Sequence, residues 1–466
     1  MSEARPIASG PAAPAASHRA ERFVYTGFEV EPRAGELRCR YRLEGPELRQ
    51  EFTELLVIEG VDAGAWAGTA VEEAARWVYL LLGASYYKAG APPVIDVGDV
   101  ALSAPDLSFL EEYYVDGLAE FAYRNGLDLS GLEIIQSAET PAARWAPPLG
   151  TPRASRPLVP FGGGIDSIVT TELVRRRVGD DETALFIVSK SGDRFAAIES
   201  AASETGLPVL RAERRLDTAI LRSRELGYLN GHVPVTGMIS AIAVLAALLH
   251  GRDAVVMSNE SSASVGNVEV DGRLVNHQWS KGSAFESGFR AALARAGVPV
   301  EYFSLLRSAS ELWVAKQFAG LTRYHDVFHS CNRAFYVEAS RRFERWCGEC
   351  DKCCFVDLVL APFVARDRLE AVFGGREPVE NPELADRFRT LLGIAAAAKP
   401  FDCVGDIAEC RSALRLAAAR PDRGESSLLH QLLAELPDEP STVDELLRPS
   451  GEDFVPDDFA TADLLV

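Results

Sequence analysis

The sequence predicts an α/β protein built on a doubly wound parallel sheet. Two observations carry this prediction: short apolar runs alternate with helical patterns from residue 157 to about residue 363, and three consecutive glycines follow the first of these runs. Short buried strands separated by helices are typical of βαβ units, whose parallel sheets are covered on both faces. The length of 466 residues is enough to bury a large core and to form about three domains.

The N-terminal third of the chain predicts three regions. Residues 1–22 are rich in Ala, Pro and Ser and lack an apolar core segment, so we expect a disordered tail rather than a secretory signal. Residues 23–144 contain alternating or apolar runs and one helical pattern, which predict a small α+β domain. Residues 145–156 belong to a stretch dense in Pro and Ala, which is typical of a linker.

The rest of the chain predicts the sheet and a helical end. Apolar runs at 158–161, 184–188, 208–210 and 254–257 each stand near a helical pattern and are read as its strands. Residues 157–363 therefore form the predicted ligand-binding domain, and residues 364–466 form a mostly helical C-terminal region.

Composition and charge exclude some classes of partner. The net charge of −20 argues against nucleic-acid binding, which needs a basic surface, but it allows a small anionic ligand. The longest apolar helix candidate, Met238–Leu249, is too short to cross a bilayer, so no membrane association is expected. We therefore expect a cytoplasmic protein that acts on a small molecule, with its cysteines in a reducing compartment.

The stretch "LVPFGGGIDSIVTTELV", Leu158–Val174, is the strongest local signal. A single glycine between strand and helix would indicate only a tight turn, but three at the carboxyl end of a parallel strand favour an anion site. Backbone N–H groups can approach a phosphate closely there, and the helix dipole adds favourable charge. The loop lacks the lysine of the Walker motif, and Ser167 stands where the dinucleotide fingerprint has its third glycine.

Gly162, Gly163, Gly164, Ile165, Asp166 and Ser167 resemble the S-G-G-x-D-S loop of the PP-loop ATP pyrophosphatase superfamily. The departure is Gly162, where that pattern usually has Ser. The resemblance implies that this loop binds the phosphates of ATP, which is cleaved to AMP and pyrophosphate. By position, the amides of the loop and the Ser167 hydroxyl would face phosphate. Asp166 would bind Mg²⁺, or cap the helix that follows.

A cluster of cysteines lies further along the chain. Cys331, Cys347, Cys350 and Cys353 follow the spacing C-x15-C-x2-C-x2-C, with Cys354 adjacent. Two-residue gaps let thiolates converge on one ion, which favours structural Zn²⁺; an iron–sulfur cluster and unligated thiols are the alternatives. Cys39, Cys403 and Cys410 are scattered, and we expect them to be inert. The loop and cluster together also resemble 7-cyano-7-deazaguanine synthases, which are much shorter.

Three polar stretches should follow the same sheet edge: "NGHVPVTG" with His232, "SNESSASVGN" with Glu260, and "VNHQWSKGSAFE" with His277 and Lys281. Each alone is more typical of an ordinary loop. Together with "GGGIDS" and "SCNRAF…WCGECDKCC", however, residues 23 to about 363 resemble the UDP-N-acetylmuramoyl-L-alanyl-L-glutamate epimerase family of bacterial cell-wall synthesis. Many family members have Lys where this chain has Ile165.

The resemblance implies an enzyme that uses ATP and Mg²⁺ to invert the terminal L-glutamate of the UDP-muramoyl dipeptide. Adenylating the carboxylate would remove its charge and make the α-proton acidic, and hydrolysis would then release AMP. Side chains whose pKa can approach the operating pH suit the proton transfer, and the candidates are His277, His232, Lys281 and Glu260. A PP-loop ligase of the deazaguanine synthase kind and a non-catalytic nucleotide-binding protein are the alternative functions.

Overall fold

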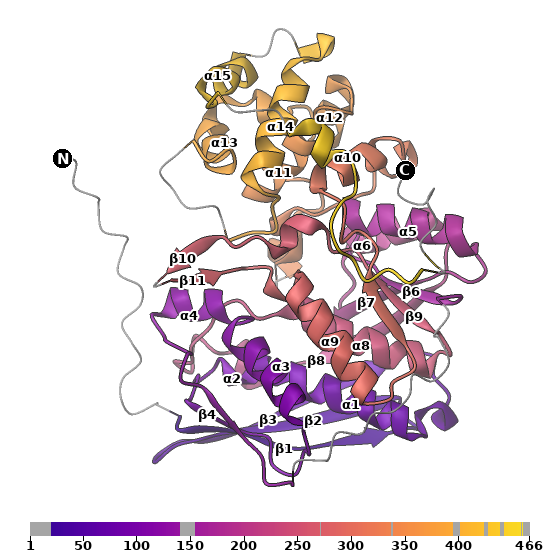
Figure 1. The fold of residues 1–466 in the computed structure, drawn as a ribbon, viewed down its shortest axis with the longest axis vertical. Helices are drawn as coiled ribbons and strands as arrows, with labels where there is room; N and C mark the ends of the chain where they lie inside the picture. The colour runs from indigo at the N-terminus through magenta and orange to yellow at the C-terminus, as the bar shows by residue number, and fades with distance from the viewer. Residues whose placement is uncertain are drawn as a thin grey trace, which may run out of the picture.

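The structure is a computed structural model that describes residues 20–139, 154–270, 272–336, 339–394, 401–423, 427–438, 442–457 and 459. Its centre is a ten-stranded sheet with the order β12-β9-β6-β7-β8-β3-β2-β1-β4-β5 (Figure 1). The strands are β1 (Arg22–Glu31), β2 (Glu36–Glu44), β3 (Arg49–Ile58), β4 (Val94–Asp96), β5 (Glu133–Ile135), β6 (Pro157–Pro160), β7 (Ala184–Lys190), β8 (Val209–Arg215), β9 (Ala254–Met257) and β12 (Glu301–Ser304). A separate hairpin joins β10 (Val268–Val270) to β11 (Arg273–Val275).

The helices pack on the sheet, on one side only of the β1–β3 strands, and the C-terminal helices extend above it (Figure 1). They are α1 (Thr69–Leu82), α2 (Ala84–Tyr87), α3 (Ala104–Val115), α4 (Ala119–Asn125), α5 (Ile165–Val178), α6 (Ala196–Thr205), α7 (Thr218–Leu221), α8 (Val235–Leu249), α9 (Ser283–Arg295), α10 (Glu311–Ala319), α11 (Asp351–Leu360), α12 (Arg366–Val372), α13 (Ala385–Leu391), α14 (Ile407–Ala418), α15 (Ser427–Glu435) and α16 (Val443–Leu446). In the part of the chain that the structure describes, none of them has the length and apolar character needed to cross a membrane.

The predicted α/β class is confirmed, but the sheet is mixed rather than wholly parallel. Strands β12, β9, β6, β7 and β8 pair in parallel, as the alternation of strands and helices predicts. Strand β3 then pairs antiparallel with β8, and β2 and β1 continue the sheet. The strands of the predicted N-terminal α+β domain therefore extend the sheet of the predicted ligand-binding domain. The domain limits drawn from the sequence stay a prediction.

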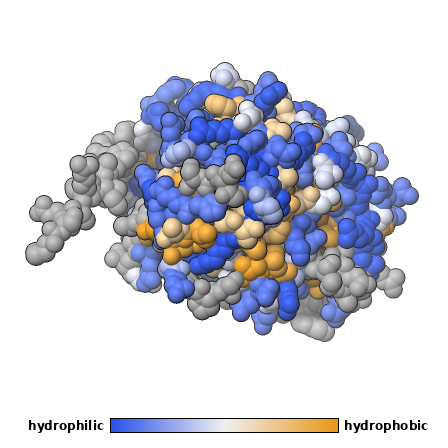
Figure 2. All heavy atoms as spheres, turned by 90° about the horizontal axis from the view of Figure 1, so that it is seen from above, coloured by the Kyte–Doolittle hydropathy of each residue, from blue (hydrophilic) through white to orange (hydrophobic). Residues whose placement is uncertain are grey.

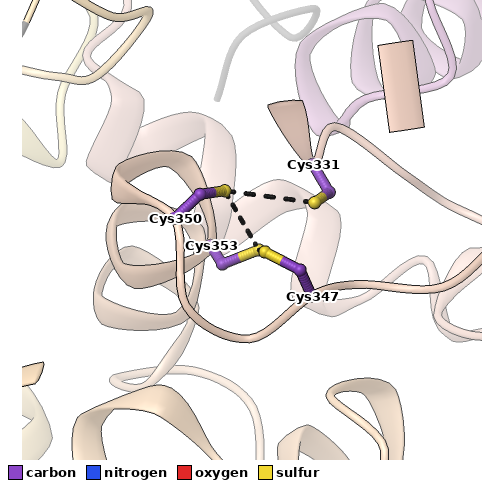
Figure 3. A group of neighbouring side chains, drawn as sticks. All are labelled: Cys331, Cys347, Cys350 and Cys353. Atoms are coloured by element: carbon purple, nitrogen blue, oxygen red, sulfur yellow. Dashed lines mark hydrogen bonds between the residues drawn. The ribbon is translucent and has the colours of Figure 1, made fainter. Parts of the chain in front are cut away.

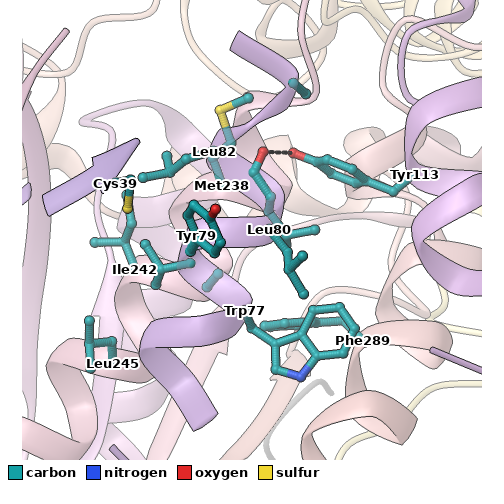
Figure 4. Close-up of a cluster of buried hydrophobic side chains, with 14 of the residues drawn as sticks. Cys39, Trp77, Tyr79, Leu80, Leu82, Tyr113, Met238, Ile242, Leu245 and Phe289 are labelled. Atoms are coloured by element: carbon teal, nitrogen blue, oxygen red, sulfur yellow. Dashed lines mark hydrogen bonds between the residues drawn. The ribbon is translucent and has the colours of Figure 1, made fainter. Parts of the chain in front are cut away.

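Burial along the strands follows their position in the sheet. In β2 every second residue is buried, because one face packs on the core and the other is partly exposed. All four residues of β9 are buried, since helices cover both faces there. One core lies between the N-terminal half of the sheet and helices α1, α3, α8 and α9. Trp77, Tyr113 and Phe289 pack in it, and the Tyr113 hydroxyl donates to the Leu81 carbonyl (Figure 4).

A second core joins α5, α10 and α11 to the C-terminal helices. Helices α12–α16 agree with the mostly helical pattern after residue 364. Arg423 and Glu377 form a fully buried ion pair beneath them, 2.7 Å apart. Seen from above, the molecule is largely hydrophilic, with small groups of hydrophobic side chains between the polar ones (Figure 2). The predicted tail falls almost wholly outside the described residues, although residues 20–22 are described and Arg22 already begins β1; most of the predicted linker also lies outside them.

Candidate active site

The glycine loop follows β6, the strand at which the order of strand addition reverses. From β6 the chain runs outward through α5, β7, α6 and β8, and it later returns through α8 to β9 on the other side of β6. Ligands of open α/β sheets bind at such a switch point, beyond the carboxyl ends of the strands. The loop after β6 contains Gly162–Gly164, and the loop after β9 contains Glu260, so both predicted segments meet at this edge.

The loop backbone requires glycine at one position in particular. Gly163 has a φ of +75°, and a Cβ there would lie 3.1 Å from the Ala197 carbonyl oxygen and 3.2 Å from the Ile198 Cα. Its own carbonyl accepts a hydrogen bond from the His329 amide, 2.9 Å long. Gly162, in contrast, is exposed, and a Cβ at that position would meet no heavy atom of the described chain within 4 Å. Gly163 is therefore the position of the loop at which any other residue would be strained.

Helix α5 begins with free amides. Its N-cap is Gly164, which has no side chain with which to cap, so the alternative in which Asp166 caps the helix is wrong. The first N–H groups of a helix have no intrahelical acceptor, and they point toward any anion at that end. The Ser167 hydroxyl donates to the Gly164 carbonyl, 3.1 Å away, rather than facing outward. The loop offers amides, and the hydroxyl would have to rotate to join them.

Buried carboxylates stand beside this helix terminus. Asp166 and Glu311 share a side-chain hydrogen bond, and Asp166 Oδ1 and Glu311 Oε2 are buried atoms that receive no hydrogen bond from any other group within the described ranges. Burial, together with the charges of Asp166 and Glu260, raises the pKa of Glu311 well above its ordinary value. Burial also raises the pKa of Asp166, and the positive charge of the Lys352 ammonium partly offsets this rise. Two neighbouring buried carboxyl groups fit the oxygen-rich coordination that Mg²⁺ prefers. Sequence reasoning missed Glu311, whose only local signal is its place after the N-cap Ser310.

Two lysines balance these carboxylates. Burial alone would lower the pKa of Lys281, but Cys403, Glu260, Asp166 and Glu311 surround it and hold its pKa above the ordinary value. Lys281 therefore stays positively charged at neutral pH. Lys352, on α11, is buried and donates a hydrogen bond to the Cys403 carbonyl. The sequence analysis did not identify Lys352, which is hidden between two cysteines of the predicted metal cluster.

A buried arginine connects the loop that contains Glu260 to the segment that contains Lys281. Arg307 pairs with Glu286, and the two side chains are 3% and 1% exposed. The same guanidinium donates to the Glu260 carbonyl at 3.0 Å and to the Lys281 carbonyl at 2.6 Å. Glu260 itself accepts from the Ala263 amide at 2.9 Å and caps a 3₁₀ turn. Glu260 thus has a structural role as a cap, and its charge also acts on the neighbouring carboxyl group of Glu311.

The two predicted histidines lie side by side. The rings of His232 and His277 are 4.2 Å apart, and Glu120 on α4 contacts His277 Nδ1 directly. Burial and the neighbouring charge of His277 lower the pKa of His232 to about 4. Burial would also lower the pKa of His277, but Cys403 and Glu120 raise it to about 9. At neutral pH His232 is neutral and His277 is protonated, the separation expected of acid–base groups.

Glu120, His232 and His277 are close enough to be considered as metal ligands, since their ligand atoms lie within 4.8 Å of one another. The Glu120–His277 contact is a direct hydrogen bond, however, and it occupies the ring nitrogen that an ion would need. We therefore treat Glu120 as the group that orients His277.

Cys403 differs from the sequence expectation of an inert thiol. Its thiol is hydrogen-bonded to His277 and lies beside Lys281. Burial would raise the pKa of this thiol, but Lys281 and His277 lower it to about 7. Cys39, in contrast, is fully buried and burial raises its pKa. No local pattern in the sequence separates these two cysteines.

The four predicted metal ligands come together at the start of α11 (Figure 3). Their sulfur atoms are 3.9 Å apart for Cys331–Cys350, 3.6 Å for Cys347–Cys353 and 3.4 Å for Cys350–Cys353. Thiolates about 2.3 Å from one tetrahedral ion are separated by nearly these distances, whereas a multinuclear iron–sulfur cluster spreads its ligands over several metals. The Glu349 amide donates to Cys347 Sγ, and Gly348 takes a φ of +70° to close the turn. The donor set fits a single metal ion.

The chain is similar in sequence to known proteins over most of its length. The chain matches the MurL N-terminal domain family over residues 15–305 and the MurL C-terminal domain family over residues 327–446. Three similar proteins are named UDP-N-acetyl-alpha-D-muramoyl-L-alanyl-L-glutamate epimerase. They come from Xanthomonas oryzae pv. oryzae (38% identical over 94% of this chain and 96% of the relative), Salinispora tropica (37%, 95% and 96%) and a Micromonospora species (38%, 95% and 98%).

Proposed function

The chain belongs to the MurL epimerase family, and from this premise we propose that it inverts the terminal L-glutamate of UDP-N-acetylmuramoyl-L-alanyl-L-glutamate during peptidoglycan precursor synthesis. The observation that carries the proposal is the identity of 37–38% over about 95% of the chain to relatives that bear this name. The family models match residues 15–305 and 327–446, which contain the glycine loop, both candidate histidines, Lys281 and the four clustered cysteines.

The proposed reaction is ATP-dependent and proceeds through an acyl-adenylate. A free carboxylate makes its α-proton very weakly acidic, because removing that proton would place a second negative charge beside the first. Joining the carboxylate to AMP neutralises it and lets the carbonyl accept the electron pair of the broken C–H bond. The epimerised acyl-adenylate is then hydrolysed, and AMP and pyrophosphate are the by-products.

The glycine loop and α5 are suited to the phosphate part of this reaction. Gly162, Gly163, Gly164 and the first amides of α5 offer donors at the positive end of a 14-residue helix. Asp166, with Glu311 beside it, would hold Mg²⁺, which supplies charge neutralisation at the phosphates. Lys281 brings a fixed positive charge toward the same carboxylates and would stabilise negative charge that develops on the substrate.

The acid–base candidates divide by protonation state. His277 is an acid at neutral pH and His232 is a base, since their pKa values lie on opposite sides of neutrality. Lys281 suits electrostatic stabilisation better than proton removal, because its pKa is raised. Glu260 is committed to a cap and to the loop held by Arg307, which makes it the weakest of the four.

The cysteine cluster has a structural role in this proposal. Zn²⁺ held by Cys331, Cys347, Cys350 and Cys353 would fix the first turn of α11, where Lys352 is buried against the site. All four positions are taken by protein ligands, which is typical of a structural ion rather than a catalytic one.

A single assay tests the proposed function. The protein is incubated with UDP-MurNAc-L-Ala-L-Glu, ATP and Mg²⁺ in deuterated water, and AMP, glutamate configuration and deuterium at the α-carbon are measured. We expect AMP, D-glutamate and one incorporated deuterium. AMP that depends on added ammonia, with the α-hydrogen retained, would indicate a ligase instead. A complete absence of pyrophosphate release with every acceptor tried would indicate a non-catalytic nucleotide-binding protein.

A further inference from the structure

Cys403 lies within the site, although the sequence predicts an inert thiol and the proposed function gives it no role. It lies in the segment 401–406 that leads into α14, far along the chain from the sheet residues it meets. Its thiol is hydrogen-bonded to His277, and its carbonyl accepts from Lys352. The segment before α14 therefore contributes a potential nucleophile or base to a site that is otherwise built by helices and by the loops that follow the strands.

The segment is fixed from both sides. Phe401 packs on Tyr123 of α4, with ring centres 5.5 Å apart, and Arg124 lies over the same ring at 5.0 Å. On the other side a Cβ at Gly405 would approach Phe355 of α11 to 2.9 Å, so only glycine fits that close packing. The Cys403 amide donates to Asp402 Oδ1 at 2.8 Å. These contacts hold the thiol in place by packing and hydrogen bonds.

The thiol, imidazole and carboxylate form a chain. Glu120, 5% exposed in its side chain, holds Nδ1 of His277, which leaves Nε2 as the nitrogen for the Cys403 thiol. Arg124 in turn pairs with Glu120 and keeps it ionised. A nucleophile or base hydrogen-bonded to a histidine that a third group orients is the arrangement that generates a reactive thiolate. The ammonium groups of Lys281 and Lys352 add to the positive field around the sulfur.

We propose that Cys403 is the catalytic residue that exchanges the α-proton on one face of the adenylated glutamate, with His277 and Glu120 as its positioning residues. This inference rests on the proposed function. The Cys403 thiolate takes the proton, so that an S–H bond forms as the Cα–H bond breaks, and the C–H electron pair moves onto the acyl carbonyl oxygen. Lys281 lies nearby to stabilise that oxygen. In the reverse direction the thiol returns the proton to the same face.

A thiolate at neutral pH is consistent with the surroundings of the sulfur. The pKa of Cys403 is lowered to about 7, while that of its partner His277 is raised to about 9, and each ion stabilises the other. The buried carboxyl groups of Glu311 and Asp166 hydrogen-bond each other, and Asp166 Oδ1 and Glu311 Oε2 receive no hydrogen bond from any other group of the described chain, which leaves these oxygens available to a ligand.

The test compares Cys403→Ala and Cys403→Ser with Cys39→Ala, a buried cysteine on β2 that serves as a packing control. Three readouts are taken: ATP–pyrophosphate exchange with the dipeptide substrate, epimerisation, and deuterium exchange of the α-proton in the L and D forms separately. We expect both Cys403 variants to retain pyrophosphate exchange within about threefold and to lose about 10²–10⁴-fold in epimerisation. Deuterium exchange should persist in at most one of the two forms, because the group on the other face remains.

A second measurement does not depend on turnover. Iodoacetamide labelling of Cys403, followed by peptide mass spectrometry across pH, should give a thiol pKa near 7 in the full chain and a value nearer the ordinary 8.5 in Glu120→Gln. Epimerisation at the wild-type rate in Cys403→Ala would overturn the inference, as would a Cys403 thiol pKa near 8.5 in the unchanged protein. If the wild-type protein itself forms no AMP, the proposed function fails, and the labelling result still reports on the thiol.

Discussion

Replacing Gly163 by alanine tests whether the glycine loop binds phosphate as proposed, because a single added methyl group would displace its backbone. At a φ of +75° an alanine costs about 1–2 kcal/mol relative to an unstrained conformation. Its Cβ would also press on the Ala197 carbonyl oxygen at 3.1 Å and the Ile198 Cα at 3.2 Å, which are backbone atoms of α6 and cannot rotate away. Overpacking of this kind adds about 1–3 kcal/mol. The free energy of unfolding should therefore fall by roughly 2–5 kcal/mol.

The same change should weaken nucleotide binding. A shift of the loop that removes one hydrogen bond to a charged phosphate costs about 1.5–3 kcal/mol, or roughly 10- to 150-fold in affinity. Isothermal titration with ATP and Mg²⁺ measures the affinity, and urea denaturation measures the stability. Gly162→Ala is the matched control, because that glycine is exposed and open and its φ is not in the left-handed region. The control should keep its stability within about 0.5 kcal/mol. If Gly163→Ala binds ATP as tightly as the unchanged protein, the loop does not hold phosphate in the way proposed.

Three further predictions concern the metal, the buried ion pair and pH. The purified protein should contain one zinc per chain by plasma mass spectrometry; Cys350→Ser should lose the metal and unfold at a lower temperature, Cys39→Ala should keep it, and iron in place of zinc would contradict the assignment. Arg307→Met leaves Glu286 buried without its partner and should cost about 3–5 kcal/mol in urea denaturation, and the double variant with Glu286→Gln should recover part of that loss; equal losses would show that the pair is not coupled. The pKa of His277 is raised to about 9, so its contribution to stability is fully present below its unfolded pKa of about 6.5 and is lost as the pH rises through 9. Wild-type stability should therefore decline between pH 6.5 and 9 by at most about 3 kcal/mol relative to His277→Gln, measured by denaturation at each pH, and parallel curves for the two proteins would refute the shift.

Local pattern predicted much of the fold. Alternation in residues 36–44 and the apolar run at 254–257 gave β2 and β9 because side-chain burial in a strand repeats every two residues or covers both faces. Local pattern did not predict the antiparallel pairing of β3 with β8. The residues of an apolar strand do not specify which neighbouring strand it pairs with or in which direction. The mixed sheet follows from that pairing, which the strand–helix alternation after residue 157 could not reveal.

The candidate site divides in the same way. The sequence predicted the candidates that form a short motif, which are the glycines of the loop, Asp166 and four cysteines, and the structure brings the four cysteines together. Glu120, Glu311 and Lys352 were missed because each sits in an ordinary helical pattern and acquires its role only from what packs against it.

By itself the sequence determined the strand–helix alternation, the glycine turn before α5 and the spacing of the clustered cysteines, because these depend on residues within a few positions of one another. Only the tertiary structure decided that Glu120 meets His277 across 157 positions and that Cys403 joins them from the C-terminal region. Contacts over such separations are set by how whole elements pack, and the charges that they bring together then fix the protonation of each group.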